Sequence, residues 1–182
     1  MNPGNGMNTK PCTPHIPQKN SWRQENLTMG KCMAIHPLPI IYSVDNKNKP
    51  NSYMFTPHGL LFSKSIMNII METCKNIQIF PAHLYYHGNE KIFDEYYTIV
   101  FPTYAAFNEN QSLFTWSDIV PEKIESLSKL VISKDKLAAI SPKDNIFHLK
   151  EKRVILLATE TAKTAIEAVT KDVAFIEVEV AE

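Results

Sequence analysis

Two short amphipathic helices, each predicted between short apolar stretches, constrain the fold of this chain most. Residues 60–80 read LLFSKSIMNIIMETCKNIQIF, and residues 156–176 read LLATETAKTAIEAVTKDVAFI. In each segment a Ser or Thr precedes apolar residues at helical spacing, which predicts a capped helix between two strands. The apolar stripes are Ile66, Met67, Ile70, Met71 and Cys74 in the first segment, and Ala162, Ala165, Ile166 and Val169 in the second.

The two segments also match in residue type when they are aligned without gaps. Matched positions include the predicted caps Ser63 and Thr159 and the stripe residues Ile70 and Ile166. An internal duplication of a strand–helix–strand unit is one explanation. The other is that any such unit needs caps and stripes at this spacing. Both explanations predict an α+β fold, with two similar short helices packed on a mainly antiparallel sheet.

The rest of the 182-residue chain divides into an arm and one domain. Residues 1–30 are rich in Asn, Pro, Gly and Thr and are predicted to form a flexible N-terminal arm, because they offer little apolar surface to bury. Residues 31–182 are predicted to form a single α+β globular domain. Within it we expect an extended edge segment at 33–44, a hairpin over 77–101 and an irregular stretch at 102–127. Further strands are expected at 128–133, 144–149 and 173–180. Asn76 is expected to end the first helix in a left-handed conformation.

Charge and cysteine content narrow the functional classes. The chain carries 19 basic and 19 acidic residues, which argues against a nucleic-acid or membrane-surface partner. Residues 1–89 are basic overall, whereas residues 90–127 hold seven Asp or Glu and two Lys. The three cysteines lack the spacing of a disulfide framework, and the N-terminus lacks an apolar signal region. Both features predict that the protein is located in the reducing cytoplasm. Cys74 is expected to be a small buried apolar residue.

Two patterns resemble metal-ligand spacing, and neither is a strong signal. Cys12 and His15, followed by Cys32 and His36, resemble a zinc ligand set but lie in the polar arm. His83 and His87 would lie roughly 13 Å apart on a strand, too far to share one ion. No metal or cofactor is therefore expected. Nucleophile, zinc-protease, phosphate-loop and dinucleotide-binding motifs do not occur in the sequence, and no enzymatic activity is expected.

The acidic central segment carries the candidate binding residues. Rigid aromatic side chains supply anchors in protein interfaces, and carboxylates around them steer a cationic partner. The opposite reading is that these aromatics belong to the core and alternate with a solvated face. The residues predicted to bind a partner are Asp94, Glu95, Tyr96, Tyr97, Glu109, Trp116, Asp118 and Glu122.

Four stretches resemble a known group of proteins, the immunity proteins of bacterial polymorphic-toxin systems, in the related families numbered eleven and forty-three. The stretches are GLLFSKSIMNIIMETCKNIQIFPAHLYYHG (59–88), EYYTIVFPTYAAFNENQSLFTWS (95–117), SKLVISKDKLAAISPKDNIFHL (128–149) and RVILLATETAKTAIEAVTKDVAF (153–175). The chain departs from the family pattern after its Tyr-rich strand, where members carry an Asp-rich turn and this chain reads FPTYAAFNENQS.

The resemblance implies a small cytoplasmic protein that binds the cognate toxin encoded by the adjacent gene. It further implies that inhibition is stoichiometric, by occlusion of the toxin's active site. Two other functions stay open at this point. One is a metal-dependent hydrolase that uses His83, His87 and nearby carboxylates, and the other is a non-catalytic scaffold module tethered by the arm.

Overall fold

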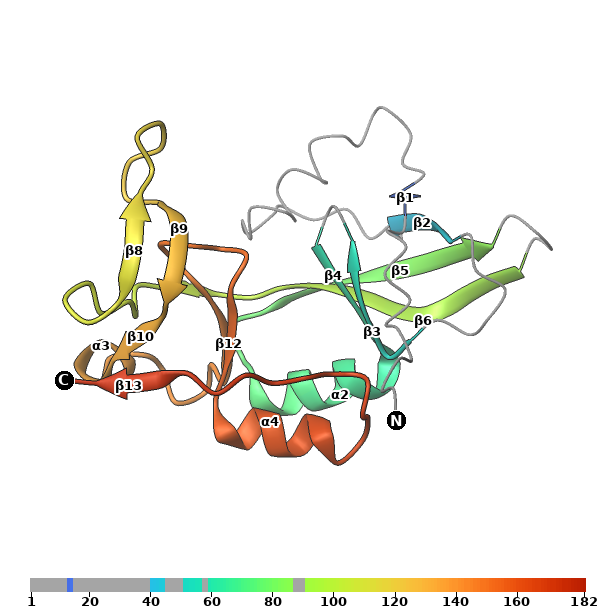
Figure 1. The fold of residues 1–182 in the computed structure, drawn as a ribbon. Helices are drawn as coiled ribbons and strands as arrows, with labels where there is room; N and C mark the ends of the chain where they lie inside the picture. The colour runs from blue at the N-terminus through green and yellow to red at the C-terminus, as the bar shows by residue number, and fades with distance from the viewer. Residues whose placement is uncertain (1–12, 15–39, 45–50, 57–58, 87–90) are drawn as a thin grey trace, which may run out of the picture.

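A computed structural model describes residues 13–14, 40–44, 51–56, 59–86 and 91–182 (Figure 1). The fold is α+β and its sheets are mainly antiparallel, as the sequence predicts. A six-stranded sheet has the order β1-β2-β5-β6-β4-β3, and only its β2–β5 pair is parallel. Its strands are β1 (Thr13–Pro14), β2 (Ile40–Val44), β3 (Tyr53–Thr56), β4 (Gly59–Ser63), β5 (Gln78–Tyr86) and β6 (Lys91–Val100).

Three smaller sheets form the other half of the described chain. One has the strand order β12-β11-β7, and the other two pair β8 with β9 and β10 with β13. Their strands are β7 (Thr103–Tyr104), β8 (Leu113–Trp116), β9 (Ile124–Lys129), β10 (Val131–Ser133), β11 (Ile146–Leu149), β12 (Leu156–Ala158) and β13 (Glu179–Ala181). The helices are α2 (Lys64–Thr73), α3 (Lys134–Ala138) and α4 (Glu160–Glu167). No helix in the described ranges is long and apolar enough to cross a membrane.

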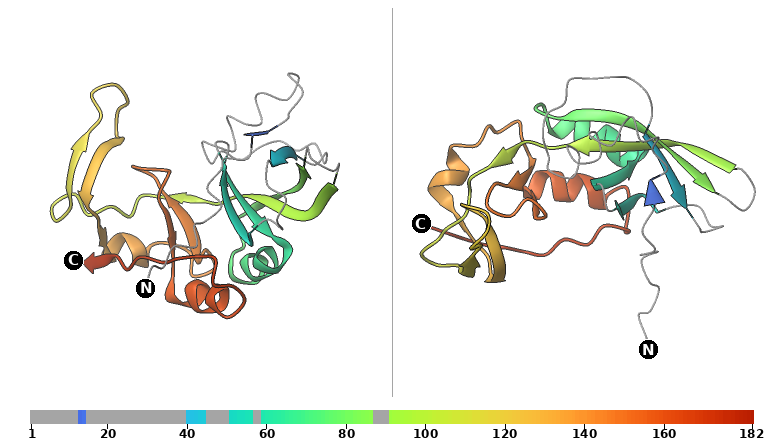
Figure 2. Two further views of the ribbon diagram at one scale, coloured as in Figure 1. Left: turned by 45° about the vertical axis from the view of Figure 1, so that its right-hand side comes forward. Right: turned by 90° about the horizontal axis from the view of Figure 1, so that it is seen from above.

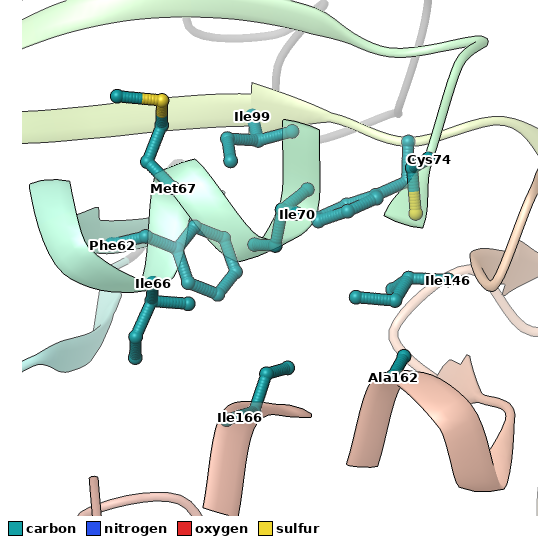
Figure 3. Close-up of a cluster of buried hydrophobic side chains, with 10 residues drawn as sticks. Phe62, Ile66, Met67, Ile70, Cys74, Ile99, Ile146, Ala162 and Ile166 are labelled. Carbon is teal, nitrogen blue, oxygen red and sulfur yellow. The ribbon is translucent and has the colours of Figure 1, made fainter. Parts of the chain in front are cut away.

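The two predicted amphipathic helices pack together against one face of the large sheet. Their stripes bury Ile66 and Ile70 of α2 and Ala162 and Ile166 of α4 in one cluster, which Figure 3 shows in close-up. Phe101, which follows β6, is buried in the same cluster. Because apolar side chains recur every three or four residues, each helix can bury most of its stripe. Two predicted stripe residues are not buried, since Met71 is 49% exposed and Val169 is 50% exposed. Cys74 is buried there as predicted, and burial raises the pKa of its thiol.

The opposite face of the large sheet is also buried. Side chains alternate along β5 and β6, so Phe80 and Val100 lie on this second face while Ile79 and Ile99 face the helices. The predicted hairpin over 77–101 is present as β5 and β6. After β6 the chain runs on to the half that contains α3 and the small sheets (Figure 1), where a separate cluster forms around Phe107.

A buried carboxylate joins the two halves of the molecule. Asp144 is 2% exposed and accepts hydrogen bonds from the Asn76 backbone and side chain and from the Tyr104 hydroxyl. Burial acts to raise the pKa of Asp144, but these hydrogen bonds outweigh it and the pKa is lowered overall. The neighbouring Asn145 donates to the Thr73 carbonyl oxygen and accepts from the Thr159 hydroxyl, so the end of α2 and the start of α4 are tied together.

The structure does not show an internal duplication. The strand β4 lies in the large sheet, whereas β12 pairs with β11 in another sheet, so the two helices enter from different surroundings. Thr159 caps α4 as predicted and accepts from the Ala162 amide, but the Ser63 hydroxyl contacts Ser65 and makes no cap bond.

Four local expectations need correction. The first helix ends at Thr73 with Cys74 extended, and Asn76 is not left-handed but donates to Asp144. The expected edge segment includes β2, which is an interior strand because β1 and β5 flank it. The stretch expected to be irregular contains β7, β8 and the start of β9. The expected closing strand at 173–180 is reduced to β13, because residues 173–178 are extended without a strand partner in the described chain. Apart from Thr13–Pro14, the predicted arm lies outside the described residues.

Candidate functional site

The hairpin formed by β8 and β9 projects from the half of the molecule that holds α3 (Figures 1 and 2). Its two strands pair in antiparallel register with two irregularities, and the Thr115 and Ser126 hydroxyls bond across it at 2.6 Å. Only one face of the hairpin packs on the body. Ile124 is buried there, and Phe114 and Leu127 are partly buried against the same cluster. The other face is exposed to solvent, as a two-stranded sheet on a small body must be.

A stack of three aromatic rings fixes the hairpin to the core. The Phe107 ring lies 4.8 Å from Phe114, and Phe114 lies 4.8 Å from Trp116, both edge-to-face. This geometry is favourable because the positive ring edge meets the negative ring face. Phe107 is buried, whereas Trp116 keeps 39% of its surface exposed. The stack therefore holds an exposed indole in a defined position.

The tip of the hairpin is apolar and internally hydrogen-bonded. The Ser117 hydroxyl accepts from the backbone amides of Ile119 and Val120 at 3.3 and 3.2 Å, and the Ser117 amide donates to Lys123. Ile119 is 89% exposed and Val120 is 48% exposed. Large apolar side chains fixed in water at a rigid tip are typical of a protein-contacting surface.

A tight turn closes this tip. The Lys123 amide donates to the Val120 carbonyl oxygen, and Pro121 and Glu122 occupy the two central positions. Glu122 has φ 56°. Among the described residues it is the one non-glycine residue with a positive φ. Proline followed by a positive φ is the arrangement of a type II turn, whose second central position favours glycine. The chain thus accepts backbone strain at Glu122 to hold the tip in one shape.

The turn between β11 and β12 clamps the hairpin next to its tip, at the start of β9. The Ile124 amide donates to Glu151, and the Lys152 ammonium donates to the carbonyl oxygens of Ile124 and Glu125. Lys123 reaches the Lys150 carbonyl oxygen, and Lys150 forms an ion pair with Glu122 at 3.2 Å. Burial, together with the nearby Arg153 cation, lowers the pKa of Lys123. These contacts order the hairpin before any partner arrives.

Carboxylates lie at both ends of the hairpin, with Asp118, Glu122 and Glu125 near the tip and Glu109 in the turn before β8. Glu109, Asp118 and Glu125 are exposed, and none of them lies within ion-pair distance of a Lys or Arg in the described ranges. Glu122 is also exposed, but Lys150 pairs with it. We call the surface of the following residues the hairpin surface: Glu109, Leu113, Trp116, Asp118, Ile119, Val120, Glu122 and Glu125. Its uncompensated carboxylates suit a basic partner.

The eight residues predicted to bind a partner fall in two separate regions. Glu109, Trp116, Asp118 and Glu122 belong to the hairpin surface. The other four lie on β6, in the large sheet. There Tyr96 is 4% exposed and its hydroxyl donates to the Asn51 carbonyl oxygen, so its ring belongs to the core. Tyr97 is partly buried on the face that the helices cover.

The two carboxylates of this second group are exposed but less isolated. Glu95 lies 3.4 Å from Lys64 at the start of α2, and Asp94 is exposed beside it. The sequence reading missed Leu113, Ile119 and Val120. The signal in the sequence was the apolar pair Ile119 and Val120 before Pro121. This pair stands in a polar stretch and follows neither strand nor helix spacing, so no buried face is predicted for it.

The candidate metal ligands stay apart or undescribed. His83 is partly buried on β5, and His87 lies outside the described residues, as do Cys12, His15, Cys32 and His36. Where the structure places side chains, no three His, Cys, Asp or Glu residues gather in a way that holds a metal ion. No protein-family model matches this chain, and a search of curated proteins finds no match either.

Proposed function

We propose that this chain is an immunity protein, which binds a cognate secreted or contact-delivered bacterial toxin and blocks it by stoichiometric occlusion of the active site. The observation that carries the proposal is the hairpin surface, an ordered apolar tip flanked by the exposed carboxylates of Asp118 and Glu125. The resemblance of four sequence stretches to immunity proteins supports the same reading. The protein would act in the cytoplasm, without turnover and without a nucleic-acid or membrane partner.

Rigidity is what makes the hairpin suitable for tight binding. Association costs free energy for every side chain and loop that becomes ordered at the interface. Here the ring stack, the Ser117 bonds and the clamp from the β11–β12 turn order the tip in advance. Trp116 and Ile119 then serve as anchors, and the carboxylates speed the encounter with a basic surface such as that of a nuclease.

A survival assay tests the proposal. The gene beside this one is expressed in a sensitive bacterial host, alone and together with this chain, and survivors are counted. If the neighbour kills alone, we expect co-expression to rescue the host and the two purified proteins to form a one-to-one complex. A toxic neighbour that this chain neither binds nor neutralises would contradict the proposal.

Matched variants then locate the surface. Reversal of Asp118 and Glu125 to Lys should weaken the complex and abolish rescue, and so should Trp116→Ala combined with Ile119→Asp. Reversal of Asp94 and Glu95 to Lys is the control, with the same change in charge on β6. Thermal unfolding of each variant separates lost binding from lost folding. If only the reversal of Asp94 and Glu95 abolishes rescue, the toxin-binding site lies on the large sheet and not on the hairpin surface.

A further inference from the structure

The segment from Asp172 to Glu182 is an extended strap on the outside of the molecule. In Figures 1 and 2 it runs from the end of α4 to β13, beside β10 and α3. Both ends are fixed. The Ser52 amide donates to Asp172, and Asn108 and Gln111 side chains donate to the Glu182 carbonyl oxygen.

At β13 the strap pairs with β10, and over residues 173–178 side chains hold it to the described part of the chain. Phe175 packs in the cluster under the helices, and Val178 packs in the cluster around Phe107. No backbone hydrogen bond joins residues 173–178 to another part of the chain that the structure describes. Ile176 is 89% exposed, and Ala174 and Glu177 are exposed too. Residues 173–178 are thus an extended segment whose amides and carbonyls have no backbone partner among the described residues.

We infer that this strap accepts an extended strand from a partner protein, in which basic side chains alternate with small or β-branched ones. An exposed extended edge is a template for main-chain pairing, in which backbone hydrogen bonds supply affinity and alternate side chains supply specificity. Residues 173–181 span about 30 Å as a strand, enough for a full added strand. The site lies apart from the hairpin surface and does not depend on the proposed function.

The charge of the strap argues for a basic strand as the occupant. Residues 172–182 contain four acidic residues and no Lys or Arg. Glu179 and Glu182 are paired with Lys129 and Lys134, but both pairs are exposed, so a competing cation can replace them at small cost. Glu177 has no ion pair within the described chain.

A second copy of this chain fits the edge poorly. Antiparallel self-pairing centred on Glu177, Val178 or Glu179 sets a glutamate opposite a glutamate in each register, and in-register parallel pairing does the same. Like charges directly opposite each other destabilise a strand pair. The alternation of acidic residues therefore protects the strap from self-association while leaving it open to a strand of opposite charge.

A peptide experiment tests the inference on the full chain. The probe is the labelled peptide Lys-Val-Lys-Val-Thr-Val-Lys-Val-Lys, and its control is the same peptide with N-methyl groups on alternate residues, which blocks backbone pairing and keeps the charge. We expect fluorescence anisotropy to show at least about tenfold weaker binding of the methylated peptide, because main-chain bonds supply the affinity. Hydrogen exchange of residues 173–178 should be fast in the free protein and slowed by the unmethylated peptide.

A pair of variants supplies the matched control on the protein side. Ile176→Pro removes one backbone donor that makes no bond in the described fold, and should abolish peptide binding with unchanged thermal unfolding. Ile176→Thr keeps the donor and should bind within about threefold of the natural chain. The inference is overturned by equal binding of both peptides, by absent binding, or by protection confined to other residues. The natural chain could instead self-associate, and Ile176→Pro could abolish that self-association. This result would mean that a second copy of the chain occupies the strap, and it would overturn the inference of a different partner protein.

Discussion

Two segments with the same kind of sequence, Asp94–Tyr97 on β6 and Phe114–Glu125 in the β8–β9 hairpin, have opposite roles in the fold. Both combine carboxylates with aromatic residues. On β6 the aromatic Tyr96 is buried, because that strand lies inside a six-stranded sheet with both faces covered. In the hairpin, Trp116 lies on the packed face beside Phe107 and Phe114 but keeps 39% of its surface exposed at the end of β8. Ile119 is exposed because it lies in the turn beyond the paired strands. An aromatic ring in the interior of a wide sheet is fully buried, whereas a ring at the end of a two-stranded hairpin stays partly in water.

The largest expected difference between the two segments is in stability. Tyr96→Ala removes a buried ring and should lower the free energy of unfolding by about 3–5 kcal/mol. Trp116→Ala removes a ring that is 39% exposed and should lower it by roughly 1–2 kcal/mol, since part of that surface is already in water. Urea unfolding measures both. Equal losses in the two variants would mean that the hairpin ring is as much a part of the core as Tyr96.

The next largest loss of stability is expected at Asp144, which connects the two halves of the molecule. Asp144→Ala leaves the buried donors of Asn76 and Tyr104 without their acceptor and should cost about 1–3 kcal/mol. The folded pKa of Asp144 is lowered from 3.8, so its contribution to stability is present above that pH and is lost as the pH falls through the folded value. The natural chain should therefore lose stability in acid more steeply than Asp144→Ala. Parallel acid-unfolding profiles for the two proteins would contradict this role.

A smaller effect is expected at the tip of the hairpin. Glu122→Gly relieves the positive φ at the turn and should stabilise the hairpin by about 0.5–1 kcal/mol, reduced slightly by loss of the exposed pair with Lys150. Hydrogen exchange of the Lys123 amide, which closes the turn, reports this locally. Glu122→Ala is the control, since it removes the same pair but keeps the strain. Faster exchange in Glu122→Gly than in Glu122→Ala would show that the turn needs no positive φ.

The smallest effect is a pH dependence near neutrality. His148 lies on β11 with its ring 6.0 Å from that of Phe101, and burial lowers its pKa from 6.5. The unfolded chain then takes up a proton more readily than the folded one, so stability should fall as the pH drops below about 6.5. His148→Gln should flatten this part of the profile. A natural chain whose stability is level between about pH 5 and 7 would contradict the assignment.

Local patterns in the sequence were enough to predict much of the fold. Most of the apolar stripes of α2 and α4 were predicted because helical spacing is set by neighbours along the chain, while Met71 and Val169 at the stripe edges stay exposed. The Thr159 cap, the β5–β6 hairpin and the buried Cys74 were predicted on equally local grounds. The candidate site was predicted in part, since four of its eight residues lie together on the hairpin surface and four lie on β6.

The other half of the candidate site depended on which faces are covered, and no local signal carries that information. Composition alone could not place Tyr96 inside and Trp116 outside, because both are amphipathic rings beside carboxylates. The hairpin was missed since two strand irregularities and a strained turn at Glu122 obscure its period-two pattern.

The sequence by itself determined the α+β class, the two helices and the acidic aromatic centre. Only the tertiary structure decided that β4 and β12 enter different sheets, that Asp144 joins the halves, and that the hairpin and the strap stay exposed, because covering a face or an edge requires contacts between residues far apart in the chain.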